Sequence, residues 1–156
     1  MEKEKKVYLM SIRPKYAYRI FAGIKKFELR KWFGLKPEPG STIIVYASGS
    51  VRAIIGEFTV GKVIFGDSNA VWRKLNEFAQ TGLGRDDYSY ISGSRAAMAL
   101  EVVNPKLYDY PITLNELRRI FPGFMPPLSF RVLELDEPLY RLLIEKARKS
   151  IKSTIS

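Results

Sequence analysis

The residues best suited to chemistry lie between Gly23 and Arg30, in the stretch Gly-Ile-Lys-Lys-Phe-Glu-Leu-Arg. From Lys26 onward charged and apolar side chains alternate, and a period of two is typical of a β-strand with one polar face. Lys25 comes just before, where the strand pleat does not fix its direction, so it can lean toward Glu28 and Arg30. We therefore predict that these three side chains converge on one cleft.

Such a group suits an anionic ligand that also forms hydrogen bonds. An Arg fork binds phosphate or carboxylate through two hydrogen bonds, and a Lys supplies a point charge. A carboxylate between two cations stays ionised and can accept from a base edge or a 2′-hydroxyl. Gly23 suits the left-handed conformation that ends a helix and reverses the chain. These features favour a nucleotide site; the alternative is a half-buried strand with a solvated polar face.

The spacing Gly23-x-Lys25-x-x-Glu28-x-Arg30, after a helix that opens Ser-Ile-Arg-Pro-Lys-Tyr-Ala from Ser11, resembles the signature of the ASCH domain, a member of the PUA-like superfamily. The resemblance implies a compact pseudo-barrel with helices near one mouth, and recognition of RNA or a modified base. It extends to a group of archaeal PUA-like proteins labelled as predicted transcriptional regulators, although no helix-turn-helix is evident here. Further segments carry it: 45–48, 53–58, 97–101 and 126–130.

The spacing of hydrophobic residues and the positions of turn residues predict the strands and helices that hold this stretch in place. Together these elements predict a single α+β domain over 1–156, with its core at 7–149 and frayed ends. The resemblance makes this a PUA-like mixed β pseudo-barrel with inserted helices. We expect strands at 7–12, 26–30, 41–47, 51–65 with a break or bulge at Gly56 or Gly61, 95–103 and 129–135. We expect helices at 14–23, 67–80, 114–120 and 138–149, a helical turn at 86–91, and a connection at 108–111.

Composition excludes several kinds of site. The chain has no Cys and no His, which removes disulfides, thiolate nucleophiles, Ser–His–Asp catalysis and Cys- or His-based metal sites, so we expect no metal ion and no cofactor. The formal charge of +10 favours a polyanionic partner, and abundant Lys, Arg and Glu without Cys fits a thermophile. No apolar run reaches the length of a membrane span, and the N-terminus lacks a signal-peptide core. We therefore expect a cytoplasmic protein with no membrane partner.

Aromatic residues near the motif could stack on a base, an interaction of roughly 1–3 kcal/mol. Trp32 is the preferred candidate because an indole in a short basic loop is not easily buried. Tyr46, Phe33, Tyr88 and Tyr90 are further candidates, with packing in the core as the alternative for Tyr46 and Phe33. The predicted ligand-binding set is Gly23, Lys25, Glu28, Arg30, Trp32, Tyr46 and Ser48.

Two classes of function fit this set. The first is a binding domain for RNA or a nucleotide. The second is a hydrolase, because some ASCH proteins are amidohydrolases of acylated cytidine and others are described as ribonucleases; Lys25 and Glu28 would then be catalytic. As a base, Lys25 would need a pKa about three units below its usual value near 10.4, some 4 kcal/mol. Glu28 stands where those amidohydrolases have Thr. Candidates for a third acid are Glu77, Asp86 and Asp87, or Glu57 and Glu101 on strands.

A purely structural or protein-interaction domain is a third possibility, and the sequence leaves the oligomeric state open.

Overall fold

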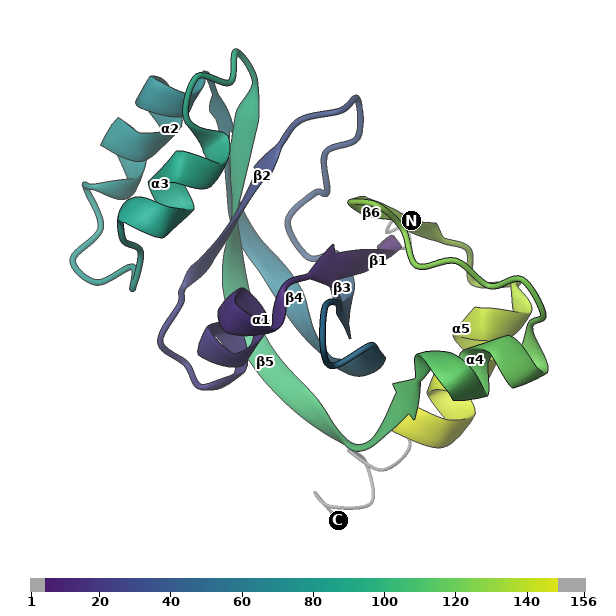
Figure 1. Cartoon of the computed structure of the whole chain (residues 1–156). Coiled ribbons are helices and arrows are strands. Elements are labelled where there is room, and N and C mark those ends of the chain that lie inside the picture. Colours follow the sequence, from purple (N-terminus) through teal and green to yellow (C-terminus); the bar gives the residue numbers. More distant parts are fainter. Residues whose placement is uncertain (1–4, 149–156) are drawn as a thin grey trace.

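The computed structural model describes residues 5–148, and within them one mixed sheet of six strands is wrapped by short helices (Figure 1). The strand order is β2-β5-β4-β3-β1-β6, in which β1 is parallel to β3 and every other pair is antiparallel. The sheet curls into a half-barrel whose edges are β2 and β6, which confirms the α+β, PUA-like architecture. The strands are β1 Val7–Ile12, β2 Phe27–Lys31, β3 Thr42–Ala47, β4 Ala53–Gly66, β5 Ala97–Thr113 and β6 Phe130–Leu133.

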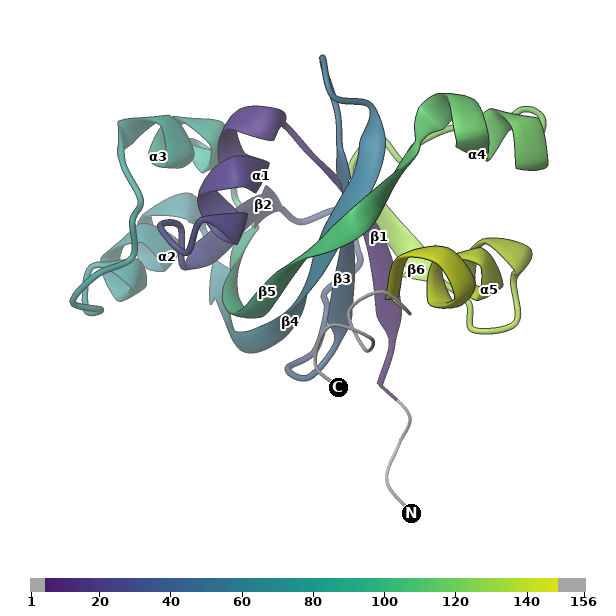
Figure 2. The same ribbon diagram turned by 90° about the horizontal axis from the view of Figure 1, so that it is seen from below.

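The helices gather in two groups on opposite sides of the sheet (Figures 1 and 2). On one side α2 and α3 lie together, on the other α4 and α5, while α1 lies between β1 and β2 in the chain. The helices are α1 Pro14–Phe21, α2 Ser68–Leu75, α3 Arg85–Ile91, α4 Leu114–Ile120 and α5 Pro138–Leu143, followed by the π-helical segment η1 Ile144–Arg148. No described helix has both the length and the apolar character needed to cross a membrane.

Side-chain alternation assigns the two faces of the sheet. On β1 and β3, Met10, Val45 and the residues two positions away from each fill the inner core. Leu9 and Ile44 point outward into a cluster under α4 and α5. Phe27 and Leu29 of β2 point outward into a third cluster under α2 and α3. Because successive residues of a strand face opposite ways, Glu28 and Arg30 must then point inward. The curled sheet therefore aims the charged residues of the motif at its own interior.

The two long strands bend through irregular pairing. The register between β4 and β5 shifts between Ile54 and Gly56, between Glu57 and Thr59, and between Val60 and Val63. Of the predicted alternatives these shifts support a bulge, because β4 continues without a break from Ala53 to Gly66. A Cβ at Gly56 would lie 2.5 Å from the Lys106 carbonyl oxygen, so glycine is required where the strands come this close. Bulges of this kind increase local twist and let the sheet curl.

Several predicted boundaries are wrong. Residues 108–111 form no connection, because β5 continues to Thr113; Pro111 is accommodated since the ladder pairs Gly56 with Leu107 and then Ile54 with Ile112, leaving 108–111 bulged. The helix predicted at 67–80 ends at Leu75 and continues only as turns. The helix predicted at 138–149 changes to π-helix at Ile144, and position 149 lies outside the described residues.

Candidate functional site

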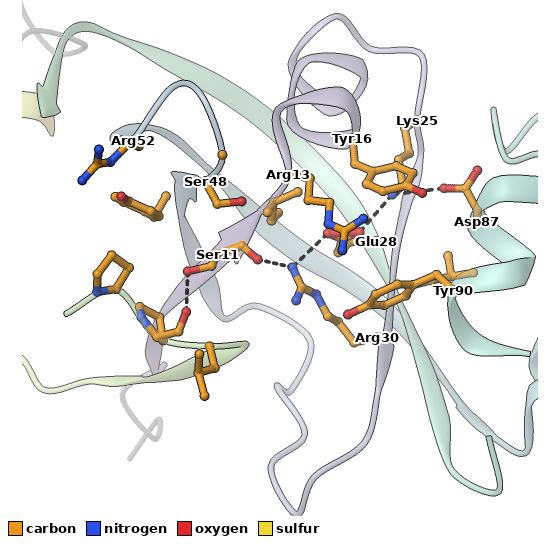
Figure 3. A pocket seen from close by; sticks show the side chains of 17 residues that line it. Ser11, Arg13, Tyr16, Lys25, Glu28, Arg30, Ser48, Arg52, Asp87 and Tyr90 are labelled. Carbon is orange, nitrogen blue, oxygen red and sulfur yellow. Dashed lines mark hydrogen bonds and ion pairs between the residues drawn. The ribbon is translucent and has the colours of Figure 1, made fainter. Parts of the chain in front are cut away.

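A cavity of about 460 Å³ opens beside the inner face of β2 (Figure 3). Its walls come from segments far apart in the chain: the end of β1, α1, the strand β2, the β3–β4 turn, α3, and the segment before β6. The volume falls in the range of small-molecule sites. It is lined by Ser11, Ile12, Arg13, Tyr16, Lys25, Glu28, Leu29, Arg30, Tyr46, Ser48, Gly49, Arg52, Asp87, Tyr90, Pro126, Pro127 and Leu128.

Four charged side chains form the floor of the cavity, and all are buried. The Lys25 Nζ lies 2.9 Å from Glu28 Oε1 and 3.2 Å from Asp87 Oδ1, and Arg30 Nη2 lies 3.5 Å from Glu28 Oε2. Two cations thus face two carboxylates, and their formal charges cancel. Burying such a group is costly unless each charge is paired, and these distances supply the pairing.

Lys25 is held in place by the turn between α1 and β2. Gly23 has a φ of +76°, the left-handed conformation predicted for it, and the amides of Ile24 and Lys25 both donate to the Arg19 carbonyl at 3.0 Å. Gly82 packs against this turn so closely that a Cβ there would lie 1.9 Å from the Ile24 carbonyl oxygen. The insertion that carries α3 is therefore docked directly onto the backbone of Lys25.

Asp87 reaches Lys25 because the start of α3 orients it. Its Oδ2 accepts a hydrogen bond from the Gly84 amide at 2.9 Å, which leaves Oδ1 to face the Lys25 ammonium as an ion pair without hydrogen-bond geometry. The Lys25 Nζ also lies 4.3 Å from the centre of the Tyr16 ring, a cation–π contact from α1. Lys25 is thus contacted from β2, α1 and α3 together.

Arg30 bridges the two edges of the half-barrel. From edge strand β2 its Nη2 donates to the Ser11 carbonyl at 2.5 Å (Figure 3). Its Nη1 donates to the Ser129 hydroxyl at 3.5 Å, next to edge strand β6. Its Nε is buried without a hydrogen-bond partner among residues 5–148. A buried donor without a partner is costly, so Arg30 is held here at the expense of one unmade hydrogen bond.

The protonation of Glu28 follows from its surroundings. Burial by itself raises the pKa of this carboxyl, but the adjacent Lys25 and Arg30 together outweigh burial and hold the pKa below its ordinary value. Glu28 is therefore an anion at neutral pH and acts as a hydrogen-bond acceptor only.

The rim of the cavity is basic and aromatic. Arg13 and Arg52 are exposed and form no salt bridge with an acidic side chain of residues 5–148, so the cavity lining has two cations more than its acids balance. Burial raises the pKa of Tyr46, and the guanidinium groups of Arg52 and Arg118 offset this only in part. Tyr46 thus remains a neutral hydroxyl beside two arginines. Arg52 has a φ of +54°, a strained conformation for a non-glycine residue of the kind that clusters at functional sites.

One wall is an apolar segment held against β1. The Ser11 hydroxyl donates to the Pro127 carbonyl at 2.6 Å, and the Ser11 amide donates to the Ser129 carbonyl at 2.9 Å. These bonds fix Pro126 and Pro127 at the mouth, and the side chain of Leu128 is fully exposed there.

The structure brings together five of the seven predicted site residues: Lys25, Glu28, Arg30, Tyr46 and Ser48 all line the cavity. Gly23 shapes the turn without lining it. Trp32 does not line it either; its ring packs against Phe65 at 5.6 Å between ring centres. Lys26 is exposed, so only part of the predicted strand face turns inward.

Among the other candidates Tyr90 lines the cavity, whereas Tyr88 packs on Trp72 and hydrogen-bonds Asn69. Phe33 is exposed and not part of the core.

Asp87 is the acid that joins the motif, and the other four candidates lie elsewhere. Each has a different partner: Glu77 pairs with Lys74 on the surface, Asp86 with Lys15, Glu57 accepts from Tyr108, and Glu101 accepts from the Lys62 amide. Sequence reasoning missed Arg13, Tyr16 and Arg52 as lining residues. Arg13 and Tyr16 stand in the segment before the motif, but Arg52 lies in a turn whose direction no local pattern indicates. In the described part of the chain no three acidic side chains gather closely enough to ligate a metal ion.

Comparison with known families gives one match that covers most of this region. Residues 10–108, which contain the motif, β3, β4 and α3, match the model of the ASCH domain. An ASCH domain-containing ribonuclease of Zymomonas mobilis is 28% identical over 135 residues, covering 86% of this chain and 88% of that protein.

Solved structures agree with the fold. The crystal structure of the ASCH protein from Zymomonas mobilis aligns with a TM-score of 0.77 at 26% identity, covering 92% of this chain and 97% of that one. A mutant of that protein with tyrosine replaced by phenylalanine aligns equally well, over 99% of its length. The N-terminal domain of McrB from Staphylothermus marinus, at 15% identity and a TM-score of 0.56, shares the fold alone.

Proposed function

This chain belongs to the ASCH domain family of the PUA-like superfamily, and on that premise we propose that it binds single-stranded RNA with one nucleotide held in the cavity. The observation that carries the proposal is the buried, charge-balanced floor of Lys25, Glu28, Arg30 and Asp87 beneath a basic rim. A floor whose charges cancel does not attract anions indiscriminately; it offers donors and acceptors at fixed places, as recognition of a base edge requires.

The floor presents groups that match a nucleobase. Lys25 and Arg30 line the cavity as donors, and the carboxylate of Glu28 is an acceptor held ionised by these two neighbours. Tyr90 supplies a half-exposed ring at the side of the cavity, whereas the ring of Tyr46 lines the cavity but is buried in the core cluster under α4 and α5. Stacking of a base on one such ring contributes roughly 1–3 kcal/mol.

The rim supplies the sequence-independent part of binding. Arg13 and Arg52 lie on the wall toward α1 and the β3–β4 turn, where the phosphates of a strand entering the cavity would pass. Phosphate contacts position an RNA strand, whereas contacts in the cavity select a base. The arrangement therefore divides affinity and selectivity between rim and floor.

The rim arginines give the direct test. We expect Arg13→Gln and Arg52→Asn each to weaken binding of a labelled single-stranded RNA about fivefold, because each removes one exposed phosphate contact of about 1 kcal/mol. Asn is chosen at position 52 because it tolerates a positive φ. Arg73→Gln, an exposed arginine on α2 outside the cavity lining, is the matched control and should bind as the unmodified protein does. Equal affinity of all four proteins would contradict the proposal.

A second candidate function, cleavage of the bound RNA, is favoured by the relative described as a ribonuclease, which aligns over 86% of this chain. Attack of a 2′-hydroxyl on its neighbouring phosphorus places extra negative charge on the phosphate oxygens, and the Lys25 ammonium or the rim guanidinium groups could stabilise it. The 2′-hydroxyl proton would pass to Glu28, an ionised carboxylate within the same cavity. The 5′-oxygen of the next nucleotide leaves as its bond to phosphorus breaks and takes up a proton from water, which gives a 2′,3′-cyclic phosphate and a 5′-hydroxyl.

Incubation of end-labelled single-stranded RNA with the protein separates binding from cleavage. If the site cleaves RNA, Lys25→Met should abolish product formation while the Arg73→Gln control retains it. N4-acetylcytidine, tested in parallel, detects the amidohydrolase activity found elsewhere in the family. Thermal unfolding of Lys25→Met must be recorded alongside, because removal of the ammonium leaves the buried Asp87 without a cation and Glu28 with Arg30 alone. Product at the unmodified rate in a folded Lys25→Met protein would exclude Lys25 from the reaction.

A further inference from the structure

A group of exposed aromatic side chains lies where β2 ends, outside the cavity. The rings of Trp32, Phe33 and Phe65 are 41%, 71% and 43% exposed. Trp32 and Phe65 contact each other edge to face, with 5.6 Å between ring centres and planes at 87°. Core packing does not account for rings this exposed. Trp32 and Phe65 are in contact and Phe33 directly follows Trp32 in the chain, so exposed apolar groups gather here as they do at interaction sites.

The patch is surrounded by cations. The Lys36 Nζ lies 4.8 Å from the centre of the Phe65 ring, and Lys31 directly precedes Trp32. The Trp32 amide donates to the Ala96 carbonyl at 3.0 Å, which brings Arg95 beside the same segment. Together these residues make a surface that we call the aromatic–basic platform, consisting of Trp32, Phe33, Phe65, Lys31, Lys36 and Arg95.

The acids closest in sequence to the platform are engaged elsewhere. Asp67, two residues after Phe65, caps α2 by accepting from the Ala70 amide at 2.8 Å. Glu38, two residues after Lys36, lies near the Tyr8 hydroxyl and raises its pKa together with burial. Lys31, Lys36 and Arg95 form no salt bridge with an acidic side chain of residues 5–148, so the platform keeps their positive charge.

The contacting pair of Trp32 and Phe65 continues the inner face of the sheet away from the cavity, whereas Lys31, one residue after Arg30 on β2, faces the other side of the same edge. Arg30 pairs with Met98, and Met98 pairs with Phe65, so their side chains project from the same face of three neighbouring strands. Trp32 is two residues beyond Arg30, a step of roughly 6.5 Å along an extended chain. That step is close to the spacing of successive nucleotides in an extended strand, so one strand can occupy both places.

We propose that the aromatic–basic platform stacks unpaired bases that flank the nucleotide in the cavity, so that the ligand is a single-stranded polynucleotide and not an isolated nucleotide. The inference rests on the proposed function, because it extends the same RNA strand. Stacking needs a free base face, which an unpaired strand offers and a duplex does not. Lys31, Lys36 and Arg95 contact its phosphates.

The charge of the platform argues against a second copy of the chain as its occupant. A twofold interface would place the same patch on both partners, and would therefore bring like-charged lysines and arginine together. Exposed rings interleaved with cations instead match the bases and phosphates of a nucleic acid.

The test uses the two tryptophans of the chain. Trp72 lies on α2 and packs against Tyr88, so a Trp72→Phe protein reports fluorescence from Trp32 alone. We expect addition of a uridine hexanucleotide to quench that fluorescence. We also expect Trp32→Ala and Phe33→Ala to lower hexanucleotide affinity roughly 5- to 150-fold, the range for loss of one stacked base. The affinity for uridine monophosphate, which reaches only the cavity, should not change. Tyr110→Ala, an equally exposed ring outside the platform and the cavity lining, is the control.

Each other result overturns the inference. If the unmodified protein binds the hexanucleotide and both platform variants bind it equally well, the platform is wrong and the proposed function stands. If the unmodified protein binds neither ligand, both proposals fail. If Trp32→Ala converts a dimer to a monomer in sedimentation without changing RNA affinity, the platform is an interface between copies. Because Phe33 is more exposed than Trp32, its variant keeps the test valid should Trp32→Ala unfold.

Discussion

At the scale of single residues, the site depends on four buried charges that are satisfied by one another. Alternation along β2 was sufficient to predict that Glu28 and Arg30 share a face, and the turn at Gly23 was sufficient to predict that Lys25 joins them. The fourth member, Asp87, was one of several candidate acids, because nothing in its own segment shows that α3 docks on the α1–β2 turn. Trp32 was misplaced since β2 ends at Lys31, and beyond that residue the alternation no longer places the side chain in the cavity.

Glu28 gives a prediction on the pH dependence of stability. The pKa of Glu28 in the folded protein lies below the ordinary value of 4.5, so the ionised carboxylate stabilises the fold. This stabilisation is fully present above about pH 4.5, and it is lost as the pH falls toward the folded-state pKa. We expect Glu28→Gln to lower the free energy of unfolding by about 3–5 kcal/mol at pH 7, because it breaks a buried ion pair. Urea unfolding at pH 7 and pH 3 measures the free energy of unfolding of the unmodified protein and of Glu28→Gln, and the difference between these free energies should be smaller at pH 3.

The control is the exposed pair of Lys74 and Glu77, whose side chains are 57% and 64% accessible. Glu77→Gln should change stability by at most about 1 kcal/mol, with little dependence on pH. A Glu28→Gln protein as stable as this control at neutral pH would show that the buried cluster does not need its carboxylate.

At the scale of elements, short segments with little regular structure determine the position of the site. The α1–β2 turn orients Lys25, the start of α3 orients Asp87, and the segment before β6 closes the mouth through its bonds to Ser11. Strands and helices were predictable in number and order because their hydrophobic periods are regular. The bulged continuation of β5 past Pro111 was not, since proline ordinarily ends a strand and only the neighbouring strand β4 shows that the ladder resumes.

Gly82 tests the docking of the insertion onto the turn. It has a φ of +72°, and a Cβ would lie 1.9 Å from the Ile24 carbonyl oxygen, a backbone atom that cannot move without displacing Lys25. We expect Gly82→Ala to destabilise the fold by roughly 1–3 kcal/mol, from the strained backbone conformation and the clash. The same variant should weaken RNA binding, because the Lys25–Asp87 contact is disturbed. Thermal unfolding and the hexanucleotide titration measure the two effects.

Gly84 is the matched position for this experiment. It lies two residues further along, where a Cβ would have no neighbouring atom within 4 Å, and it begins α3 as the N-cap residue with an extended φ of −135°. Gly84→Ser should leave stability unchanged or slightly raised, because Ser is a favourable N-cap residue. Equal loss of stability in the two variants would show that the insertion tolerates no change at all, and that close contact at Gly82 is not the cause.

At the scale of the whole molecule, the half-barrel leaves two edge strands, and the side chain of Arg30 spans them with bonds to Ser11 and Ser129. The site therefore forms only once β1, β2 and the segment before β6 are all in place. The formal charge of +10 is the corresponding global property, and it raises the local concentration of polyanions without selecting among them. The net charge could be predicted from composition alone. That one arginine connects the two edges of the sheet could not, because the contact depends on the tertiary structure.

Entry of RNA across the arginine rim can be measured through the salt dependence of RNA affinity, compared between the unmodified protein and the Arg13→Gln, Arg52→Asn double variant. If RNA enters the cavity across this rim, the double variant loses two phosphate contacts, and the slope of log affinity against log salt becomes shallower by about 1.4. The Arg73→Gln control should keep the original slope. An unchanged slope in the double variant, with RNA still bound, would place the RNA elsewhere on the protein and contradict the account.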